Sequence, residues 1–188
     1  MTAISSAPTG PAPADGDGTS SSVLPAENFR AVFRAHPAGV AVVALVDDGR
    51  PVGFTATSVI SVSAEPPLLA FSLASTSSSW PAVSRARTLT VSFLADHQDD
   101  VSARFATSGI DRFAAGGWTA LPTGEPVIDG AISWVRAEVL ERTAVGGSYL
   151  VTVLALESSV VHQRATETAR PLVYHDRRYH RIGDHSAL

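Results

Sequence analysis

Residues 53–80 read GFTATSVISVSAEPPLLAFSLASTSSSW, and this stretch carries the strongest fold signal in the chain. An apolar strand candidate, Leu68–Leu73, follows a Pro-Pro bend, and a hydroxyl-rich patch lies on either side of the pair. The first patch contains Thr55, Thr57, Ser58, Ser61 and Ser63, and the second runs from Ser75 to Ser79. Neutral donors and backbone N–H groups in this arrangement can surround a phosphorylated, planar ligand.

Upstream of this stretch the sequence predicts a short helix and a β-hairpin. The helix is expected over 27–35, because apolar residues recur there at helical spacing, namely Phe29, Val32 and Phe33. The β-branched run over 39–46 reads as a strand and ends at the turn signal DDGRP, residues 47–51. A second strand returns from Val52 and leads directly into the hydroxyl-rich stretch.

Downstream, the sequence predicts mostly strands joined by tight turns. The predicted elements are a helix over 80–87, a strand over 88–94, a helix over 96–105, strands over 131–141 and 149–161 joined by Gly146-Gly147, and a last short strand over 172–174. About six or seven strands connected mainly by hairpins predict a mainly β fold, a closed or partly closed β-barrel with short helices. The lack of regular strand–helix alternation argues against a doubly wound parallel sheet.

Composition divides the chain into one domain and two tails. Residues 1–25 are rich in Ala, Pro, Ser and Gly and poor in large apolar side chains, so they predict a disordered tail. Residues 26–183 are apolar enough for a single core, and 184–188 are expected to be a short C-terminal tail.

Charge and residue usage exclude several classes of protein. The net charge of -4 leaves no basic stripe for nucleic acid. No apolar run is long enough to span a membrane and no signal-peptide pattern is present, so a cytoplasmic protein is expected. The chain has no cysteine, which excludes disulfides, thiolate metal sites and cysteine nucleophiles.

The chain also has no lysine, because all 14 of its Lys and Arg residues are arginine. Schiff-base chemistry and a Walker-type phosphate loop are therefore excluded. Arginine, hydroxyls and backbone N–H groups are the remaining means of holding a phosphate. The run Ser75–Ser79, between a strand and the start of a helix, is the favoured position, although ordinary strand and turn serines are the alternative.

Familiar catalytic signatures are missing. The sequence has no G-x-S-x-G elbow, and no G-x-G-x-x-G follows a strand. The six histidines do not have metal-ligand spacing, so no metal is expected. We therefore assign no catalytic side chain.

Several short segments form a recognisable series when they are taken in order. They are Phe29-Arg30-x3-Arg34, GVAVV at 39–43, GFTATS at 53–58, SVS at 61–63 with Pro66-Pro67, SSSW at 77–80, VSFL at 91–94, Arg104-Phe105, Asp111-Arg112-Phe113 and LVYH at 172–175. From Phe29 to Tyr179 the chain thereby resembles the flavin reductase family, which has an FMN-binding split-barrel fold.

The resemblance implies a site for FMN or FAD, with the choice between them open. The implied contacts are, for the ring and ribityl chain, Thr55, Ala56, Thr57, Ser58, Val59 and Ser61; for the ring from the next strand, Ser72 and Leu73; for the phosphate, Ser78, Ser79 and Trp80; and to complete the pocket, Phe93 and Leu94. The family is typically homodimeric, so a homodimer is expected as well.

The implied reaction is hydride transfer from NADH or NADPH to flavin N5, supplying reduced flavin to a separate monooxygenase. The nicotinamide side is implied to include Ser148, Tyr149 and His175. Where the family commonly has Gly-Asp-His, this chain has Gly147-Ser148-Tyr149. Two further hypotheses stay open: a flavin-binding split-barrel protein without nicotinamide-dependent activity or acting on another substrate, and a β-barrel binding module that holds no flavin.

Overall fold

The computed structural model describes residues 23–159, 170–183 and 186–187. The predicted N-terminal tail lies almost entirely outside these residues, as do most of the short C-terminal tail and the last two positions of the strand predicted to end at residue 161. Three helices and twelve strands are assigned in the described parts, α1 (Ala26–Arg34), β1 (Ala38–Gly39), β2 (Ala41–Asp47), β3 (Arg50–Ala56), β4 (Ile60–Ala64), β5 (Pro67–Ala74), α2 (Trp80–Arg85), β6 (Thr88–Phe93), α3 (Asp99–Ala106), β7 (Trp118–Ala120), β8 (Pro126–Ile128), β9 (Ser133–Val145), β10 (Ser148–Ser158), β11 (Leu172–His175) and β12 (Arg178–Arg181).

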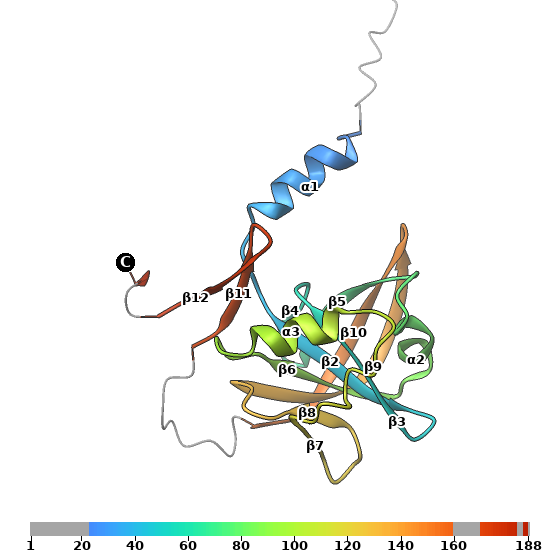
Figure 1. Cartoon of the computed structure of the whole chain (residues 1–188). Helices are drawn as coiled ribbons and strands as arrows, with labels where there is room; N and C mark the ends of the chain where they lie inside the picture. Colours follow the sequence, from blue (N-terminus) through green and yellow to red (C-terminus); the bar gives the residue numbers. More distant parts are fainter. Residues whose placement is uncertain (1–22, 160–169, 184–185, 188) are drawn as a thin grey trace, which may run out of the picture.

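A seven-stranded antiparallel sheet forms the body, in the order β3-β2-β6-β9-β10-β5-β4. Its two edge strands, β3 and β4, are consecutive in the chain, and β3 also approaches β5. The sheet therefore curls into a barrel (Figure 1). The barrel is open between β3 and β4, which residues 57–59 connect across the opening. This confirms the mainly β barrel with short helices.

Strand β2 is buried on both faces, and this explains its continuous apolar sequence. Val43 and Leu45 point into the barrel, where Phe71 and Val151 also pack. On the other face, Val42 belongs to a second cluster, whose further members include Ala44, Leu94, Phe105, Phe113, Ile128 and Leu172. A strand covered on both sides shows no hydrophobic alternation.

The three helices differ in how they meet the barrel. α3 packs against β3 and β2, and α2 contacts β2. α1 projects away from the barrel (Figure 1), and none of its residues is buried. Within the described residues, no helix is long and apolar enough to cross a membrane.

The helices and hairpins largely follow the sequence, and the differences have local causes. Helix α3 begins at Asp99, three residues later than expected. The residues before it form a turn instead, in which the Gln98 side chain folds back and its Oε1 accepts a hydrogen bond from the Ala95 N–H at 3.0 Å. The strands β4, β7, β8 and β12 were not predicted. Strand β12 has the sequence RYHR, in which no apolar alternation announces a strand.

A buried ion pair fixes the β7–β8 hairpin to the barrel. Arg136 Nε on β9 donates to Glu125 Oε1 at 2.9 Å, and the hydroxyl of Thr123 donates to the other carboxylate oxygen. Burial by itself raises the pKa of Glu125, but hydrogen bonds from Arg136, Thr123 and Thr88 outweigh this effect and lower the pKa to about 2. The carboxylate is therefore held in its charged form.

We predict that this pair makes the fold acid-sensitive. The pKa of Glu125 is lower in the folded state than in the unfolded chain, so the pair stabilises the fold fully at pH values above the ordinary pKa of a glutamate. The stabilisation declines as the pH falls from there toward the folded-state pKa. Between about pH 6 and about pH 3 the wild type should lose about 2 kcal/mol more unfolding free energy than Glu125→Gln, as measured by urea denaturation. Parallel pH profiles for the two proteins would contradict the assignment.

Candidate functional site

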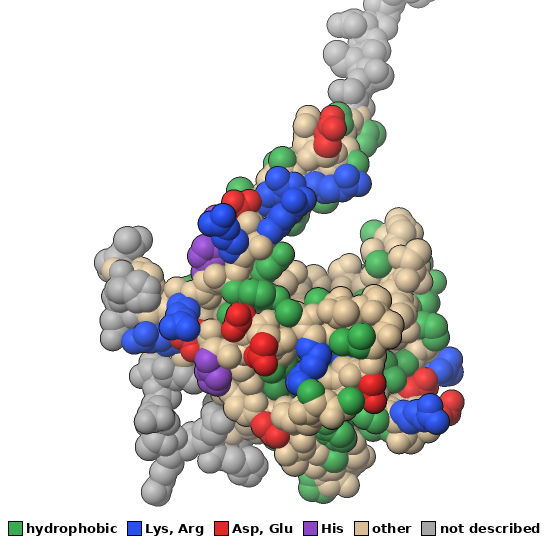
Figure 2. Space-filling model, in the orientation of Figure 1, with side chains coloured by type: hydrophobic (Ala, Val, Ile, Leu, Met, Phe, Trp, Pro, Cys, Tyr) green, Lys and Arg blue, Asp and Glu red, His purple; other side chains and the backbone are tan. Residues whose placement is uncertain are grey.

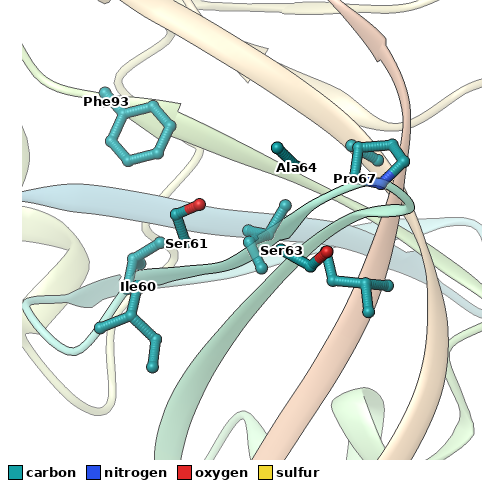
Figure 3. Close-up of a pocket in the computed structure, with 10 residues that line it drawn as sticks. Ile60, Ser61, Ser63, Ala64, Pro67 and Phe93 are labelled. Atoms are coloured by element: carbon teal, nitrogen blue, oxygen red, sulfur yellow. The ribbon is translucent and has the colours of Figure 1, made fainter.

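The segment that crosses the barrel opening lies between two cavities. The first, of about 460 Å³, is lined mainly by apolar side chains, including Val59, Leu69 and Phe93. Figure 3 shows the Phe93 ring on one side of this cavity, and residues of β4 with Pro67 on the other. Three of the residues predicted to contact the flavin, Val59, Ser61 and Phe93, therefore line the same cavity.

The second cavity, of about 690 Å³, lies between α1, the same segment and the β11–β12 turn. Ile60 lines both cavities, so the two adjoin. The other lining residues are Arg30, Phe33, Arg34, His36, Ala38, Thr57, Ser58, Tyr174, His175, Asp176 and Arg177. The structure thus brings the predicted residues Thr57, Ser58 and His175 together.

Ser58 fixes the crossing segment to β5. Its Oγ donates to the Ser72 carbonyl at 3.1 Å and accepts from the Ser72 N–H at 3.0 Å. One side chain therefore satisfies both main-chain groups of Ser72. This is a role for the first hydroxyl patch that requires serine rather than any small residue.

The second hydroxyl patch meets the β9–β10 hairpin instead. The Ser75 N–H and hydroxyl both donate to the Gly147 carbonyl, at 3.0 and 2.9 Å. Trp80 and Tyr149 stack, with ring centroids 3.7 Å apart and an interplanar angle of 13°. Tyr149 and its neighbour Ser148 therefore lie beside the predicted phosphate segment, residues 78–80. His175, the third residue predicted for the nicotinamide side, lines the second cavity instead.

Arg112 holds the serine-rich loop, residues 75–79, against β3, a role that the sequence did not predict. Its Nη1 donates to the Gly53 carbonyl at 2.7 Å and to Ser79 Oγ at 3.1 Å, and its Nε donates to the Thr107 carbonyl at 2.8 Å. Burial lowers the pKa of Arg112 from its ordinary value. Ser79 is buried and engaged by Arg112, so Ser78 presents the exposed hydroxyl of the predicted phosphate set.

Other predicted contacts lie in the framework of the site. Ala56, Leu73 and Leu94 are buried core residues. The Thr55 hydroxyl donates to the Ser102 carbonyl on α3 at 2.6 Å, and Ser72 is exposed on β5. These residues position the segment and its strands.

The arginines of the second cavity were also missed as site residues. Arg30 and Arg34 are four residues apart on α1, and Arg177 comes from the β11–β12 turn. The i, i+4 spacing of two arginines on a predicted helix was the available signal, because that spacing places both on one face. In the described part of the chain, no group of three His, Asp or Glu side chains could hold a metal.

Comparisons with known proteins agree on one family. The model of the "Flavin reductase like domain" family matches residues 33–183. An NADH:FMN oxidoreductase of Rhodococcus qingshengii is 46% identical over 83% of this chain and 81% of its own. The reductase subunit HsaB of a flavin-dependent monooxygenase of Rhodococcus jostii is 33% identical over 87% of this chain and 82% of its own. A flavin reductase domain protein of Arthrobacter sp. FB24 superposes with a TM-score of 0.76 at 32% identity, over 84% of this chain and 95% of its own.

We predict that Arg112→Gln destabilises the protein by about 2–4 kcal/mol, since it removes three charge-assisted hydrogen bonds, two of them part-buried. Urea unfolding measures the loss, and hydrogen exchange should show it spreading through residues 75–80. Arg85→Gln is the matched control: Arg85 pairs with Asp47 at 2.6 Å but is exposed, so its loss should cost at most about 1 kcal/mol. Equal losses for the two variants would contradict the role given to Arg112.

Proposed function

This chain belongs to the flavin reductase family, and from that membership we propose that it transfers hydride from NADH to FMN. The observation that carries the proposal is the apolar cavity adjoining a basic one at residues 57–61. The 46% identity to a protein named NADH:FMN oxidoreductase supports the choice of the two nucleotides.

The residues present fit a flavin. A planar ring requires apolar walls with a few polar groups, and the first cavity offers Val59, Leu69 and Phe93 with the hydroxyl of Ser61. Thr57 and Ser58 supply polar groups on the side of the second cavity, and exposed Ser78 remains our proposed phosphate contact. The flavin supplies the hydride acceptor when bound.

The contribution of the chain is to bind, orient and exclude water. Apolar walls around the ring keep the reacting atoms dry, and the Ser58–Ser72 hydrogen bonds hold the crossing segment rigid. Holding two reactants in a fixed geometry accelerates their reaction without a nucleophile or a general base. This accords with a site to which we assign no catalytic side chain.

We further propose a separate monooxygenase as the consumer of reduced flavin, on the strength of the likeness to a monooxygenase reductase subunit. We also propose a homodimer in the cytoplasm. Support for the dimer comes from α1, where Phe29, Val32 and Phe33 are each more than half exposed, and from edge strand β4, where Ile60 and Val62 are too. Exposed apolar faces and sheet edges are usually covered.

The reaction predicts NADH oxidation that depends on both protein and FMN, followed by the near-ultraviolet absorbance of NADH. Parallel assays without protein, and with NADPH or FAD, define the background and the preference. Flavin binding without NADH oxidation would favour the alternative of a flavin-binding protein without reductase activity. That alternative is based on Ser148-Tyr149, which stand where the family commonly has Asp-His. A protein that leaves the flavin spectrum unchanged would favour the binding module.

The dimer predicts a specific response to charge on α1. Phe29→Glu should weaken association at least about tenfold, because it buries a carboxylate in an apolar contact. Ala31→Glu places the same charge on the opposite face of the helix and should leave association unchanged. Sedimentation equilibrium measures both. A monomeric wild type would contradict the dimer, and equal behaviour of the two variants would contradict the part given to α1 in it.

A further inference from the structure

Three arginines from opposite ends of the chain line one cavity. Arg30 and Arg34 come from α1, and Arg177 comes from the turn between β11 and β12. Figure 2 shows basic side chains along α1 down to its base. With a volume of about 690 Å³, the cavity lies in the size range of small-molecule sites.

The charge of this cavity is poorly balanced by the protein itself. Asp176 is the carboxylate among the residues that line it, against three guanidinium groups and two histidines, His36 and His175. No ion pair found among residues 23–159, 170–183 and 186–187 includes any of the three arginines. Like charges gathered around a concave surface attract an anion.

The backbone at the same place is a tight hairpin turn. Asp176 and Arg177 are the two residues between β11 and β12, and their φ of 46° and 62° fit a two-residue type I′ turn, in which both central residues are left-handed. The Asp176 N–H donates to the Arg34 carbonyl at 3.1 Å, which ties the turn to the end of α1. The turn thereby places Arg177 in the wall of the cavity that the α1 arginines also line.

We propose that Arg30, Arg34 and Arg177 form a phosphate subsite, and that it holds the diphosphate of the reduced nicotinamide dinucleotide. Guanidinium groups match phosphate oxygens in charge and in donor geometry. The cavity also contains Thr57 and Ser58, which belong to the segment proposed to hold the flavin, and His175. A dinucleotide anchored here by its phosphates could bring its nicotinamide to that segment. The inference rests on the proposed function.

The test uses Arg30→Gln, Arg34→Gln and Arg177→Asn, the last because asparagine tolerates a left-handed backbone. α1 buries no residue, so the α1 variants should fold, and circular dichroism checks all three. ADP, which carries the diphosphate, serves as the binding probe. Each variant should raise the Kd for ADP and the KM for NADH about tenfold, with little change in kcat and in the Kd for FMN.

Two further variants sharpen the result. Asp176→Asn removes the carboxylate of the cavity and should tighten ADP binding, an effect opposite in sign to that of the arginine variants. Arg50→Gln removes an exposed arginine at the far end of β3, about 20 Å from Thr57 for a strand of this length, and should change nothing. Raising the salt concentration should weaken ADP binding to the wild type more than to the arginine variants.

The outcomes separate the hypotheses. Unchanged ADP and FMN affinities in all three arginine variants would overturn the subsite. A raised Kd for FMN with an unchanged Kd for riboflavin would overturn the assignment to the nicotinamide dinucleotide and give the subsite to the flavin phosphate. Binding of ADP needs no turnover, so a wild type that binds ADP through these arginines but oxidises no NADH would sink the reductase proposal and leave the subsite standing.

Discussion

Gly53 is the point at which the sheet, α3 and the loop after it come into contact. A Cβ at this position would lie 2.9 Å from Phe105 Cε1 and 3.0 Å from Phe113 Cζ, closer than packed carbon atoms approach. The missing side chain lets both rings rest on the backbone of β3, and Arg112 closes the contact by donating to the Gly53 carbonyl at 2.7 Å. The same guanidinium reaches Ser79, so the position of the serine-rich loop depends on how closely two aromatic rings approach one strand.

This packing gives the Asp-Arg-Phe segment a structural meaning. The Asp111 carboxylate accepts from the Phe113 N–H at 3.0 Å, which shapes the turn and orients the two residues that follow it. Phe113 then packs edge-on against Phe105 and Trp118. One short segment thus supports both the outer core and the loop at the candidate site.

Much of the fold could be predicted from the sequence, because hairpins and amphipathic helices leave local signals. The β2–β3 hairpin follows from its turn residues, and α1 from its spaced phenylalanines. Strand β12 could not be predicted, because its pairing with β11 depends on a partner and not on its own pattern. At the site, the grouping of Thr57 and Ser58 with His175 depends on the pairing of β11 with β1, outside the barrel sheet, which brings together residues more than a hundred positions apart. The burial of Ser79 and its hydrogen bond from Arg112 could not be predicted either, because a run of serines does not show which of them is buried.

The isolation of α1 would link the proposed dimer to the proposed phosphate subsite. In a single copy, this helix forms one wall of the basic cavity yet buries no side chain, and the Asp176 N–H to Arg34 carbonyl contact ties its end to the β11–β12 turn. A neighbour that covers its apolar face would hold that wall in place and lower the entropy lost when an anion binds. Thermodynamic reciprocity then requires the anion to strengthen the association in turn. Dilution and nucleotide depletion would then act on the same equilibrium, through a helix that has no buried residue in the single copy.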